Sequence, residues 1–345
     1  MRIAVLSDAH SNLNALKAAL NDSQKRDVER YWFLGDAVGY GPRPVAPLMF
    51  LKRYVHPDDW VMGNHDAMMA DLLLPDDLAE LGDGHRAKFE IRERGPDNKP
   101  TGEILYKGSA RAQLMRMDEW EETGPTPIQA IELNRAALKA HPEADAFWRA
   151  EFTKGRVAPR IHTLDGVDHI LTHARQNDLG RYIYGWQHDI FLPAEFHQLK
   201  MQADESGRPR IQWQGHTHVP TMVKARSIRN GDFEFDAVRI RPEETYPLDS
   251  DLALVNPGSV GQPRDLDPRA AYAVLETTAR EVTFYRVPYD WRATAQDMNA
   301  QGYPESLVRR LRDATPTGST PPSWLEHYEQ ARAIGPQEEA RNDPL

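Results

Sequence analysis

Short apolar runs that end in metal-binding residue types most constrain how this chain can fold. Residues 2–7 have the pattern of a buried strand and lead directly into Asp8 and His10. Similar runs precede four further polar blocks, which are Gly35-Asp36, Gly63-Asn64-His65-Asp66, Thr172-His173 and Gly215-His216-Thr217-His218. Polar groups that follow parallel strands collect at the carboxyl edge of a sheet. The pattern therefore predicts an α/β fold in which distant segments meet at one site.

Composition limits the chemistry available to this site. The 345 residues suffice for one large domain or two modest ones, and 40% of them are apolar. A net charge of -10 argues against capture of nucleic acid or of an anionic membrane as the main activity. The chain has no cysteine, which excludes disulfides, thiolate metal ligands and a cysteine nucleophile. A metal must be held by His, Asp, Asn or Glu, which suits Mn²⁺, Fe or Zn²⁺.

Targeting signals are missing from the sequence. The first apolar run is too short for the core of a signal peptide, and no stretch reaches the length of a transmembrane span. We therefore expect a cytoplasmic protein without a membrane partner.

The periodicity of apolar residues divides the chain into regions. A helix with Ser11 as its N-cap is expected over residues 11–20. Residues 67–165 read as a mainly helical insertion, with helices expected over 128–140 and 144–152. Strands are expected at 31–34, 60–62, 169–172, 210–213, 219–225, 233–240, 252–255, 271–276 and 281–287. Beyond residue 289, helices are expected over 307–311 and 324–333.

The spacing of donors within the blocks favours a site for two ions. Asp8 and His10 are two residues apart, and positions i and i+2 of an extended backbone point to the same side. His216 and His218 repeat this spacing. The other donors are a carboxylate that can bridge two ions, an amide oxygen and a ring nitrogen, from Asp36, Asn64 and His173. Two ions about 3.5–4 Å apart can clamp the attacking and leaving oxygens of an in-line displacement.

In order and spacing, the five blocks resemble the calcineurin-like metallophosphoesterases, whose pattern is D-x-H, G-D, G-N-H-[DE], H and G-H-x-H. The resemblance covers approximately residues 1–66 and 168–290. It implies that one ion is held by Asp8, His10, Asp36 and His218. It implies that the other is held by Asp36, Asn64, His173 and His216. By the same resemblance, His65 protonates or steadies the leaving oxygen, and Asp66 orients His65 or its loop.

The resemblance also implies an architecture. The fold class is α/β, a two-sheet α/β/β/α sandwich with helices outside both sheets. Residues 1–290 form the metallophosphoesterase domain, interrupted by a helical cap at 67–165, and residues 291–345 form a helical or flexible tail. The insertion leaves the core just after Asn64 and returns just before His173, so we expect it to overhang the site and to select the substrate.

Two further stretches refine the resemblance. Residues 35–42 and 256–264 are similar to a bacterial, phosphodiesterase-like branch. The Ser/Thr protein phosphatases of the superfamily have an Asp-Arg pair where this chain has Gly39-Tyr40, and a Glu where it has Asp66. These departures disfavour a protein phosphatase.

Three residues outside the blocks are candidates for substrate binding. Arg175 follows His173 by two residues and Arg264 ends the second stretch, so both are candidates for phosphate binding. A surface salt bridge is the alternative for each arginine. His188 follows the Thr172-His173 block and is a candidate for the pocket lining, while the remaining histidines are expected to be structural.

The sequence therefore favours a metal-dependent phosphoesterase that hydrolyses phosphodiester bonds of a small organic or nucleotide substrate. In the expected mechanism, a hydroxide that bridges two divalent ions attacks phosphorus in line, and Mn²⁺ is the ion of choice for assays. A phosphomonoesterase and a non-catalytic binding scaffold are the alternatives. The sequence leaves open the physiological substrate, the metal identity and the oligomeric state.

Overall fold

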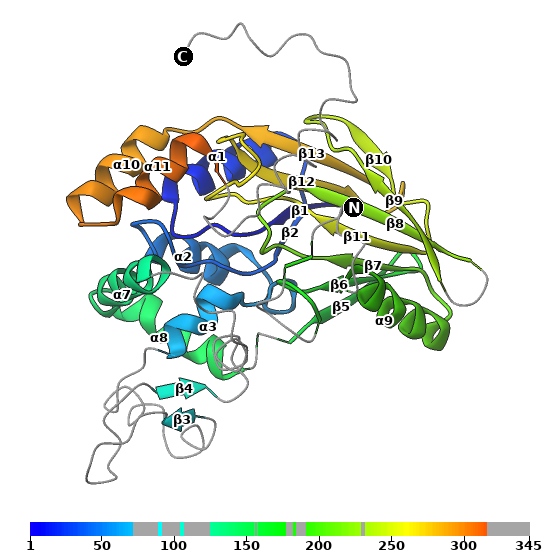
Figure 1. The fold of residues 1–345 in the computed structure, drawn as a ribbon, viewed down its shortest axis with the longest axis horizontal. Coiled ribbons are helices and arrows are strands. Elements are labelled where there is room, and N and C mark those ends of the chain that lie inside the picture. Colours follow the sequence, from blue (N-terminus) through cyan, green and yellow to red (C-terminus); the bar gives the residue numbers. More distant parts are fainter. Residues whose placement is uncertain are drawn as a thin grey trace, which may run out of the picture.

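Two β-sheets packed face to face form the centre of the structure, and helices cover their outer faces (Figure 1). The computed structural model describes residues 1–71, 89–91, 104–106, 125–154, 156, 158–176, 182–183, 191–228 and 232–315. The predicted α/β/β/α sandwich is confirmed. Apolar strand faces are buried both against the opposite sheet and against helices, as layered folds of this class require.

The first sheet has five strands in the order β10-β13-β12-β1-β2. These are β1 (Arg2–Leu6), β2 (Arg30–Phe33), β10 (Thr245–Pro247), β12 (Ala270–Glu276) and β13 (Glu281–Val287). β1 pairs in parallel with β2 and antiparallel with β12, with Ile3 opposite Leu275. The parallel pair places the carboxyl ends of β1 and β2 at one edge of the sheet, and Asp8 and Asp36 follow there.

The second sheet has six strands in the order β5-β6-β7-β11-β8-β9. These are β5 (Arg160–Leu164), β6 (Val167–Leu171), β7 (Arg210–Trp213), β8 (Thr221–Ser227), β9 (Phe233–Val238) and β11 (Leu252–Asn256). β6, β7 and β11 run in parallel, and the other neighbours are antiparallel. A separate pair of strands, β3 (Phe89–Ile91) and β4 (Ile104–Tyr106), belongs to the segment predicted as an insertion.

Alternation along β1 shows how one strand serves two cores. Ile3 and Val5 enter the core between the sheets, whereas Ala4 and Leu6 belong to the outer core with the helices. Trp32 of β2 and Trp213 of β7 share the inter-sheet core, with ring centroids 6.0 Å apart. Burial on both faces explains why these strands are continuous apolar runs in the sequence.

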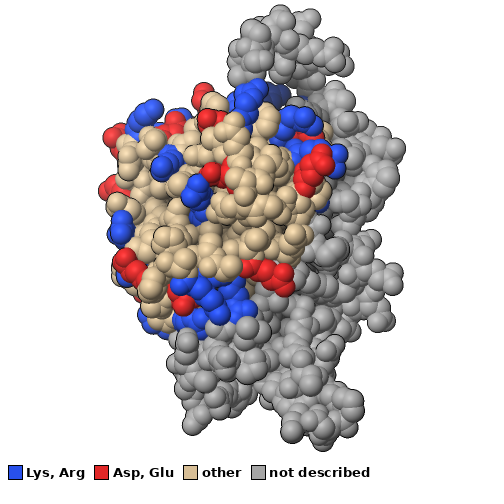
Figure 2. All heavy atoms as spheres, turned by 90° about the vertical axis from the view of Figure 1, so that its left-hand side faces the viewer, with Lys and Arg blue, Asp and Glu red and all other residues tan. Residues whose placement is uncertain are grey.

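Helices flank both sheets. They are α1 (Leu13–Gln24), α2 (Val45–Tyr54), the 3₁₀ turn η1 (Pro57–Asp59), α3 (Asn64–Asp71), α7 (Pro125–Lys139), α8 (Pro142–Thr153), α9 (Phe191–Ser206), α10 (Trp291–Ala300) and α11 (Glu305–Asp313). α1 packs on β12, α9 packs on β7 and β11, and α10 packs on α1 and α11. The face that includes α7 and α10 carries basic and acidic side chains at several places (Figure 2). No helix in the described part of the chain has the length and apolar character needed to cross a membrane.

Two local predictions near the first strands were wrong. Asn12, not Ser11, is the N-cap of α1, because its side chain accepts a hydrogen bond from the Ala15 N–H at 3.2 Å. The Ser11 hydroxyl instead donates to Oδ1 of Asn134 on α7. Residues 60–62 form an isolated bridge from Trp60 to Phe33 rather than a strand, since the chain turns directly into α3.

Other differences concern elements without a strong sequence pattern. β5 lies within the segment 67–165 that was predicted to be mainly helical, yet it forms the edge of the second sheet. Its sequence mixes polar and apolar residues, as a half-exposed edge strand can, so it lacks the apolar run that marked β6. α2, α9 and α10 were not predicted, whereas α7 and α8 correspond to the helices expected over 128–140 and 144–152. The helix expected over 324–333 lies outside the described residues.

Candidate metal centre

The predicted metal ligands come together at the carboxyl ends of β1, β2, β6 and β7, where the two sheets meet. Asp8 and His10 follow β1, Asp36 follows β2, and His173 follows β6. His216 and His218 follow β7, and Asn64 begins α3. Six of these seven residues are buried, and Asn64 is half-buried. The alignment of parallel strands therefore brings together ligands that are more than 200 residues apart in the sequence.

The backbone of the ligand loops differs from the expected extended form. Five ligands have left-handed φ angles, with values of 53° at Asp8, 43° at His10, 55° at Asp36, 66° at His216 and 61° at His218. Asp8 and His10 do reach the same site, but the alternation of an extended backbone is the wrong reason. Non-glycine residues in this region are strained by about 1–2 kcal/mol each and persist only where the surroundings enforce them.

Hydrogen bonds between the loops enforce these conformations. The Asp8 N–H donates to the Gly35 carbonyl and the His10 N–H donates to the Asp36 carbonyl, each at 3.0 Å. On the second sheet, the Gly215 N–H donates to the His173 carbonyl at 2.8 Å. A Cβ at Gly63 would lie 2.1 Å from Oδ1 of Asp36, so that position requires glycine. The ligand loops are thus locked to one another by main-chain contacts.

The first set of donors surrounds one point with its ligand atoms. The ligand atoms of Asp8, His10, Asp36 and His218 all lie within 4.8 Å of one another. Nε2 of His218 is 3.3 Å from Oδ1 of Asp8, and Nε2 of His10 is 3.6 Å from Oδ2 of Asp36. Neighbouring ligands on a cation with bonds of about 2.0–2.2 Å lie approximately this far apart. The predicted first ligand set therefore fits a divalent ion.

The second set shares Asp36 with the first. The ligand atoms of Asp36, His173 and His216 again lie within 4.8 Å of one another. Nε2 of His173 is 3.4 Å from Oδ2 of Asp36 and 2.9 Å from Oδ1 of Asn64. Because one carboxylate belongs to both sets, the geometry fits two adjacent cations bridged by Asp36.

The tautomers of the histidines show what this arrangement needs. Nδ1 of His10 faces the Val38 carbonyl at 3.2 Å, and Nδ1 of His218 faces the Gln262 carbonyl at 2.5 Å. Each Nδ1 must carry the proton to donate to its carbonyl, so each Nε2 presents a lone pair. The two Nε2 atoms are 3.0 Å apart. Two lone pairs at this distance repel each other unless a cation or a proton lies between them.

A histidine of the second set is oriented by a backbone carbonyl in the same way. Nδ1 of His173 faces the Leu34 carbonyl at 2.8 Å, which directs its Nε2 toward Asp36 and Asn64. Metal-binding histidines usually donate their other N–H to a carbonyl or carboxylate in this way.

The electrostatics of the site also suit metal ligands. Burial opposes ionisation of Asp8 and Asp36, but neighbouring histidines hold the pKa of both carboxyls below the usual range. Burial lowers the pKa of His10, His216 and His218, so these rings stay neutral. Burial is outweighed at His173, where the Asp36 carboxylate raises the pKa to about 9. A bound cation would displace that proton, as metal binding to such ligands generally does.

Comparison with known proteins decides the family. The sequence model of the calcineurin-like phosphoesterases matches residues 1–241, more than half of the chain. The chain belongs to the calcineurin-like phosphoesterase family. A metallophosphoesterase from Sphaerobacter thermophilus is 28% identical, and the match covers 91% of this chain and 99% of that one with a TM-score of 0.58. The hypothetical protein PH1004 from Pyrococcus horikoshii shares the fold at 14% identity, with coverage of 91% and 98% and a TM-score of 0.55.

Two curated proteins are similar in sequence to this phosphoesterase. The uncharacterized protein MJ0912 of Methanocaldococcus jannaschii is 25% identical over 311 residues, which are 90% of this chain and 96% of that protein. A symmetrical bis(5'-nucleosyl)-tetraphosphatase of Psychromonas ingrahamii is 34% identical over 67 residues, which are 19% of this chain and 24% of that protein. Family membership makes the chain a phosphoester hydrolase.

His65 and Asp66 have separate roles in this phosphoesterase. The His65 ring lies beside His10 and Tyr40, with centroids 4.8 and 4.4 Å away, and burial lowers its pKa to about 4. Asp66 points elsewhere: its carboxylate accepts hydrogen bonds from the backbone N–H groups of Gly63, Val38 and Ala37 at 3.0, 3.1 and 3.3 Å. Asp66 therefore holds the loop that carries Asp36, and among the described residues no hydrogen bond joins its carboxylate to the His65 ring.

The stretch 256–264 supports the metal ligands, although Arg264 was the only residue in it that was predicted as a site residue. The Ser259 hydroxyl and the Gly261 N–H both donate to the Asp8 carbonyl at 2.9 Å. Nδ2 of Asn256 donates to the Gly215 carbonyl at 2.6 Å. The Gln262 carbonyl orients His218. The similarity of this stretch to a bacterial, phosphodiesterase-like branch was the signal, but only the fold shows which groups the stretch binds.

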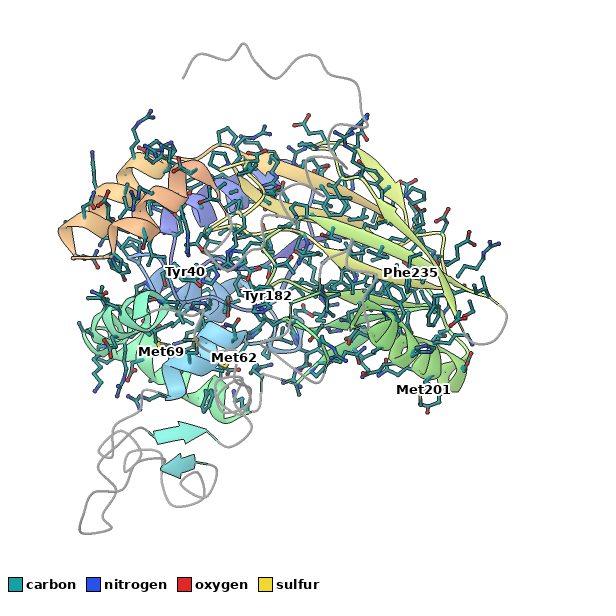
Figure 3. All side chains as sticks on the ribbon, viewed as in Figure 1. Tyr40, Met62, Met69, Tyr182, Met201 and Phe235 are labelled. Carbon is teal, nitrogen blue, oxygen red and sulfur yellow. The ribbon has the colours of Figure 1, made fainter. Side chains whose placement is uncertain are left out.

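The candidate substrate residues have different surroundings. Arg264 is 4% exposed and donates to the hydroxyls of Tyr182 and Tyr40 at 3.2 and 3.4 Å. Those tyrosines lie near each other at the centre of the molecule (Figure 3). Nε of Arg175 is 3.1 Å from Oε2 of Glu195 on α9, so this guanidinium has the carboxylate partner that was the alternative to phosphate binding. His188 lies outside the described residues.

Tyr40 and Tyr182 were not predicted as site residues. The Tyr182 ring stacks on His216 with a centroid distance of 4.1 Å and an interplanar angle of 15°. The Tyr40 ring is 4.7 Å from His10. No local signal in the sequence distinguishes either tyrosine from the others in the chain.

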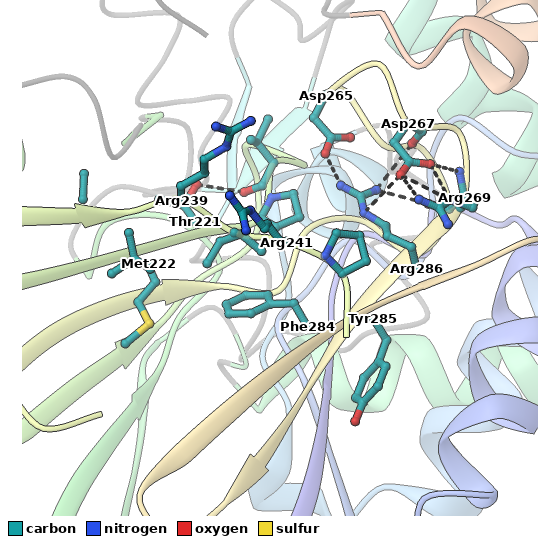
Figure 4. Close-up of a pocket in the computed structure, with 16 residues that line it drawn as sticks. Thr221, Met222, Arg239, Arg241, Asp265, Asp267, Arg269, Phe284, Tyr285 and Arg286 are labelled. Atoms are coloured by element: carbon teal, nitrogen blue, oxygen red, sulfur yellow. Dashed lines mark hydrogen bonds and ion pairs between the residues drawn. The ribbon is translucent and has the colours of Figure 1, made fainter. Parts of the chain in front are cut away.

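A cavity of about 360 Å³ lies between β8, β9 and β13, beside the segment 265–269 rather than over the metal ligands. In this cavity, Arg286 reaches Asp265 and Asp267 (Figure 4). Asp265 follows Arg264 directly, so Arg286 anchors the segment that positions the Arg264 guanidinium.

Proposed function

We propose that this phosphoesterase is metal-dependent and hydrolyses phosphodiester bonds of small organic or nucleotide substrates. The observation that carries the proposal is the pair of donor sets that share Asp36 and direct lone pairs of imidazole nitrogens at common points. The partial similarity to the symmetrical bis(5'-nucleosyl)-tetraphosphatase of Psychromonas ingrahamii supports nucleotides among the substrates.

Two divalent ions would occupy the ligand sets described above. When bound, they would supply an activated water and neutralise charge on the phosphoryl oxygens. Asp36 would be a ligand in both sets. Asp66 and the 256–264 stretch would hold the ligands in place, because Asp66 binds the N–H groups of the two residues after Asp36 and Ser259 binds the Asp8 carbonyl.

Around these ligands, the side chains of the protein bind the phosphoryl group and handle the proton. Arg264 lies beside Tyr40 and Tyr182 next to the ligand histidines, where its charge can stabilise phosphoryl oxygens. His65 is neutral in this buried position and retains one ring N–H, which it can donate to the departing oxygen. The buried ring of Tyr40 and the half-buried ring of Tyr182 lie against His10 and His216 and limit access of bulk water to the donors.

The alternatives make different use of the same site. A phosphomonoesterase would need the same donors, so the choice between diester and monoester rests on the substrate pocket. A non-catalytic scaffold would not need the complete and oriented donor set found here. A cytoplasmic location stays a prediction of the sequence analysis.

The test measures metal content and hydrolysis together. We expect protein loaded with Mn²⁺ to hydrolyse bis(4-nitrophenyl) phosphate faster than 4-nitrophenyl phosphate. Asp36→Asn should remove at least one ion and abolish turnover, because Asp36 belongs to both donor sets. Asp22→Asn is the matched control, since it neutralises a half-buried carboxylate on α1 that is not a metal ligand.

Each outcome has a definite meaning. Loss of turnover and metal in Asp36→Asn, but not in Asp22→Asn, supports the proposal. Two bound ions with cleavage of the monoester alone favour the phosphomonoesterase. Absence of both metal and turnover in the wild type contradicts the proposal and favours the scaffold.

A further inference from the structure

The helix α11 brings a second guanidinium toward the candidate metal centre. Leu307 and Leu311 are buried in a core cluster that includes Tyr40, the tyrosine beside His10 and His65. Arg310 lies between these two leucines in the sequence and is partly exposed. Packing of α11 on Tyr40 therefore fixes where Arg310 sits relative to the site.

Backbone hydrogen bonds also connect the end of α11 to one of the candidate metal ligands. The Ala314 N–H caps α11 on the Arg310 carbonyl at 2.9 Å, and the Leu266 N–H donates to the Ala314 carbonyl at 3.1 Å. Two residues earlier, the Arg264 N–H donates to the carbonyl of His218 at 3.3 Å. The end of α11, the Arg264 segment and a metal ligand are thus joined through the main chain.

The groups whose charges act on Arg310 are unusual for an arginine. They are Arg264, Tyr40 and Tyr182, and Arg264 donates hydrogen bonds to both tyrosine hydroxyls. Burial, and then the charge of Arg264, lower the pKa of Arg310. Within the described part of the chain, no carboxylate forms an ion pair with Arg310.

Its neighbours on the same helix behave differently. Arg309 pairs with Glu305 at 3.8 Å, and Arg312 pairs with Asp313 at 2.6 Å. The charges of two guanidiniums in a partly desolvated place repel each other, and an anion bound by both would offset that repulsion. Arg264 binds the two tyrosines that lie beside His10 and His216, so an anion held by Arg264 would be part of a bound substrate.

We propose that Arg310, together with Arg264, is a specificity-determining residue that binds a second phosphoryl group of the substrate. The substrate class is then phosphoesters with at least two adjacent phosphoryl groups. This inference rests on the proposed function, because the donor sets are taken to hold the first phosphoryl group.

Binding of 5'-AMP and 5'-ADP tests the proposal, since the two probes share a nucleoside and differ by one phosphoryl group. Calorimetry on the full chain with Mn²⁺ should show tighter binding of ADP than of AMP. Arg310→Gln should weaken ADP binding about tenfold and leave AMP binding unchanged, as expected for loss of one charged hydrogen-bond partner. Arg309→Gln, the matched control on the same helix, should leave both affinities unchanged. Arg310→Lys keeps the charge and should retain part of the ADP preference.

Two results would overturn the proposal. One is a wild type that binds AMP and ADP equally, and the other is an Arg310→Gln variant that weakens both ligands to the same degree. The binding measurement requires no turnover. If the wild type hydrolyses neither nitrophenyl substrate, the proposed function fails, whereas the AMP and ADP affinities report on Arg310 independently.

Discussion

Nε2 of His10 lies 3.0 Å from Nε2 of His218, although 208 residues separate the two in the sequence. Both rings present a lone pair there, because both Nδ1 atoms face backbone carbonyls. The folded protein maintains this repulsive pair through contacts of the Val38 and Gln262 loops. The cost is relieved when a cation lies between the rings, so folding and metal binding should be coupled.

A divalent cation should therefore stabilise the folded protein. At a free Mn²⁺ concentration one hundred times its Kd, the free energy of unfolding should rise by about 2.7 kcal/mol. Urea unfolding in Mn²⁺ and in EDTA measures this increment. His218→Asn should lose most of it, whereas His197→Asn on α9 should keep it. Equal unfolding free energies of the wild type in both solutions would contradict the prediction.

Gly261→Ala should damage the site through the backbone of the first ligand loop. A Cβ at this position would lie 2.0 Å from the Ala9 carbonyl oxygen, between Asp8 and His10. The loop must shift, so we expect weaker Mn²⁺ binding, measured by calorimetry, together with lower stability. Gly302→Ala is the control. Its Cβ meets nothing within 4 Å but its φ of 75° is strained, so it should cost about 1–2 kcal/mol without changing metal affinity.

The position of the metal ligands could be predicted because it depends on local sequence. An apolar strand followed by Asp8, Asp36 or His216 contains both the element and the donor in a few adjacent residues. Parallel pairing then brings the strand ends together without further information. The fold class followed for the same reason, since strands buried on both faces form continuous apolar runs.

The backbone and the supporting contacts could not be predicted in this way. The left-handed angles at Asp8 and His10 are enforced by carbonyls of residues 35 and 36, which come from another strand. Asn134 is an ordinary polar residue in a helical pattern, and its role depends on loops about a hundred residues away. Leu307 and Leu311 join Tyr40 in one buried cluster only through the packing of α11. Such contacts depend on tertiary neighbours, which a local pattern does not contain.

Asn134→Leu should destabilise the loops around the site. The side chain of Asn134 accepts hydrogen bonds from the Ser11 hydroxyl and the Gly39 N–H, and donates to the Gly41 carbonyl and the Tyr303 hydroxyl. Leucine leaves these buried groups without their partner, so we expect a loss of about 2–5 kcal/mol in the free energy of unfolding. Urea unfolding measures the loss.

Metal content gives a second readout for this variant. Asn134 belongs to α7, in the segment predicted to be a cap, yet it binds the chain next to His10. We expect reduced Mn²⁺ content in Asn134→Leu. The control is Glu132→Leu, which replaces an exposed residue of the same helix and should have normal Mn²⁺ content. Unchanged stability and metal content in Asn134→Leu would show that α7 does not support the site.

Protonation of His169 should destabilise the protein in mild acid. The ring is 3% exposed, and its Nδ1 accepts a hydrogen bond from Nε1 of Trp213 at 3.1 Å. Burial lowers the pKa of His169 to about 4, below the value of about 6.5 expected in the unfolded chain. As the pH falls through 6.5, the unfolded state takes up a proton before the folded state does. Stability should therefore be complete above pH 6.5 and decrease toward pH 4.

The size of this effect can be isolated with a residue that does not titrate. Between pH 7 and pH 5, the contribution of His169 to the free energy of unfolding should fall by about 2 kcal/mol. The interval from the unfolded-state pKa of about 6.5 down to pH 5 is about 1.5 pH units, and each unit is worth about 1.36 kcal/mol. The decrease in unfolding free energy over this interval should be smaller by that amount in His169→Gln than in the wild type. His56→Gln, which replaces an exposed histidine, should retain the wild-type decrease. With EDTA present, the metal ligands titrate identically in all three proteins and contribute equally to the decrease. If His169→Gln still shows the full wild-type decrease in urea unfolding, His169 is not the group responsible.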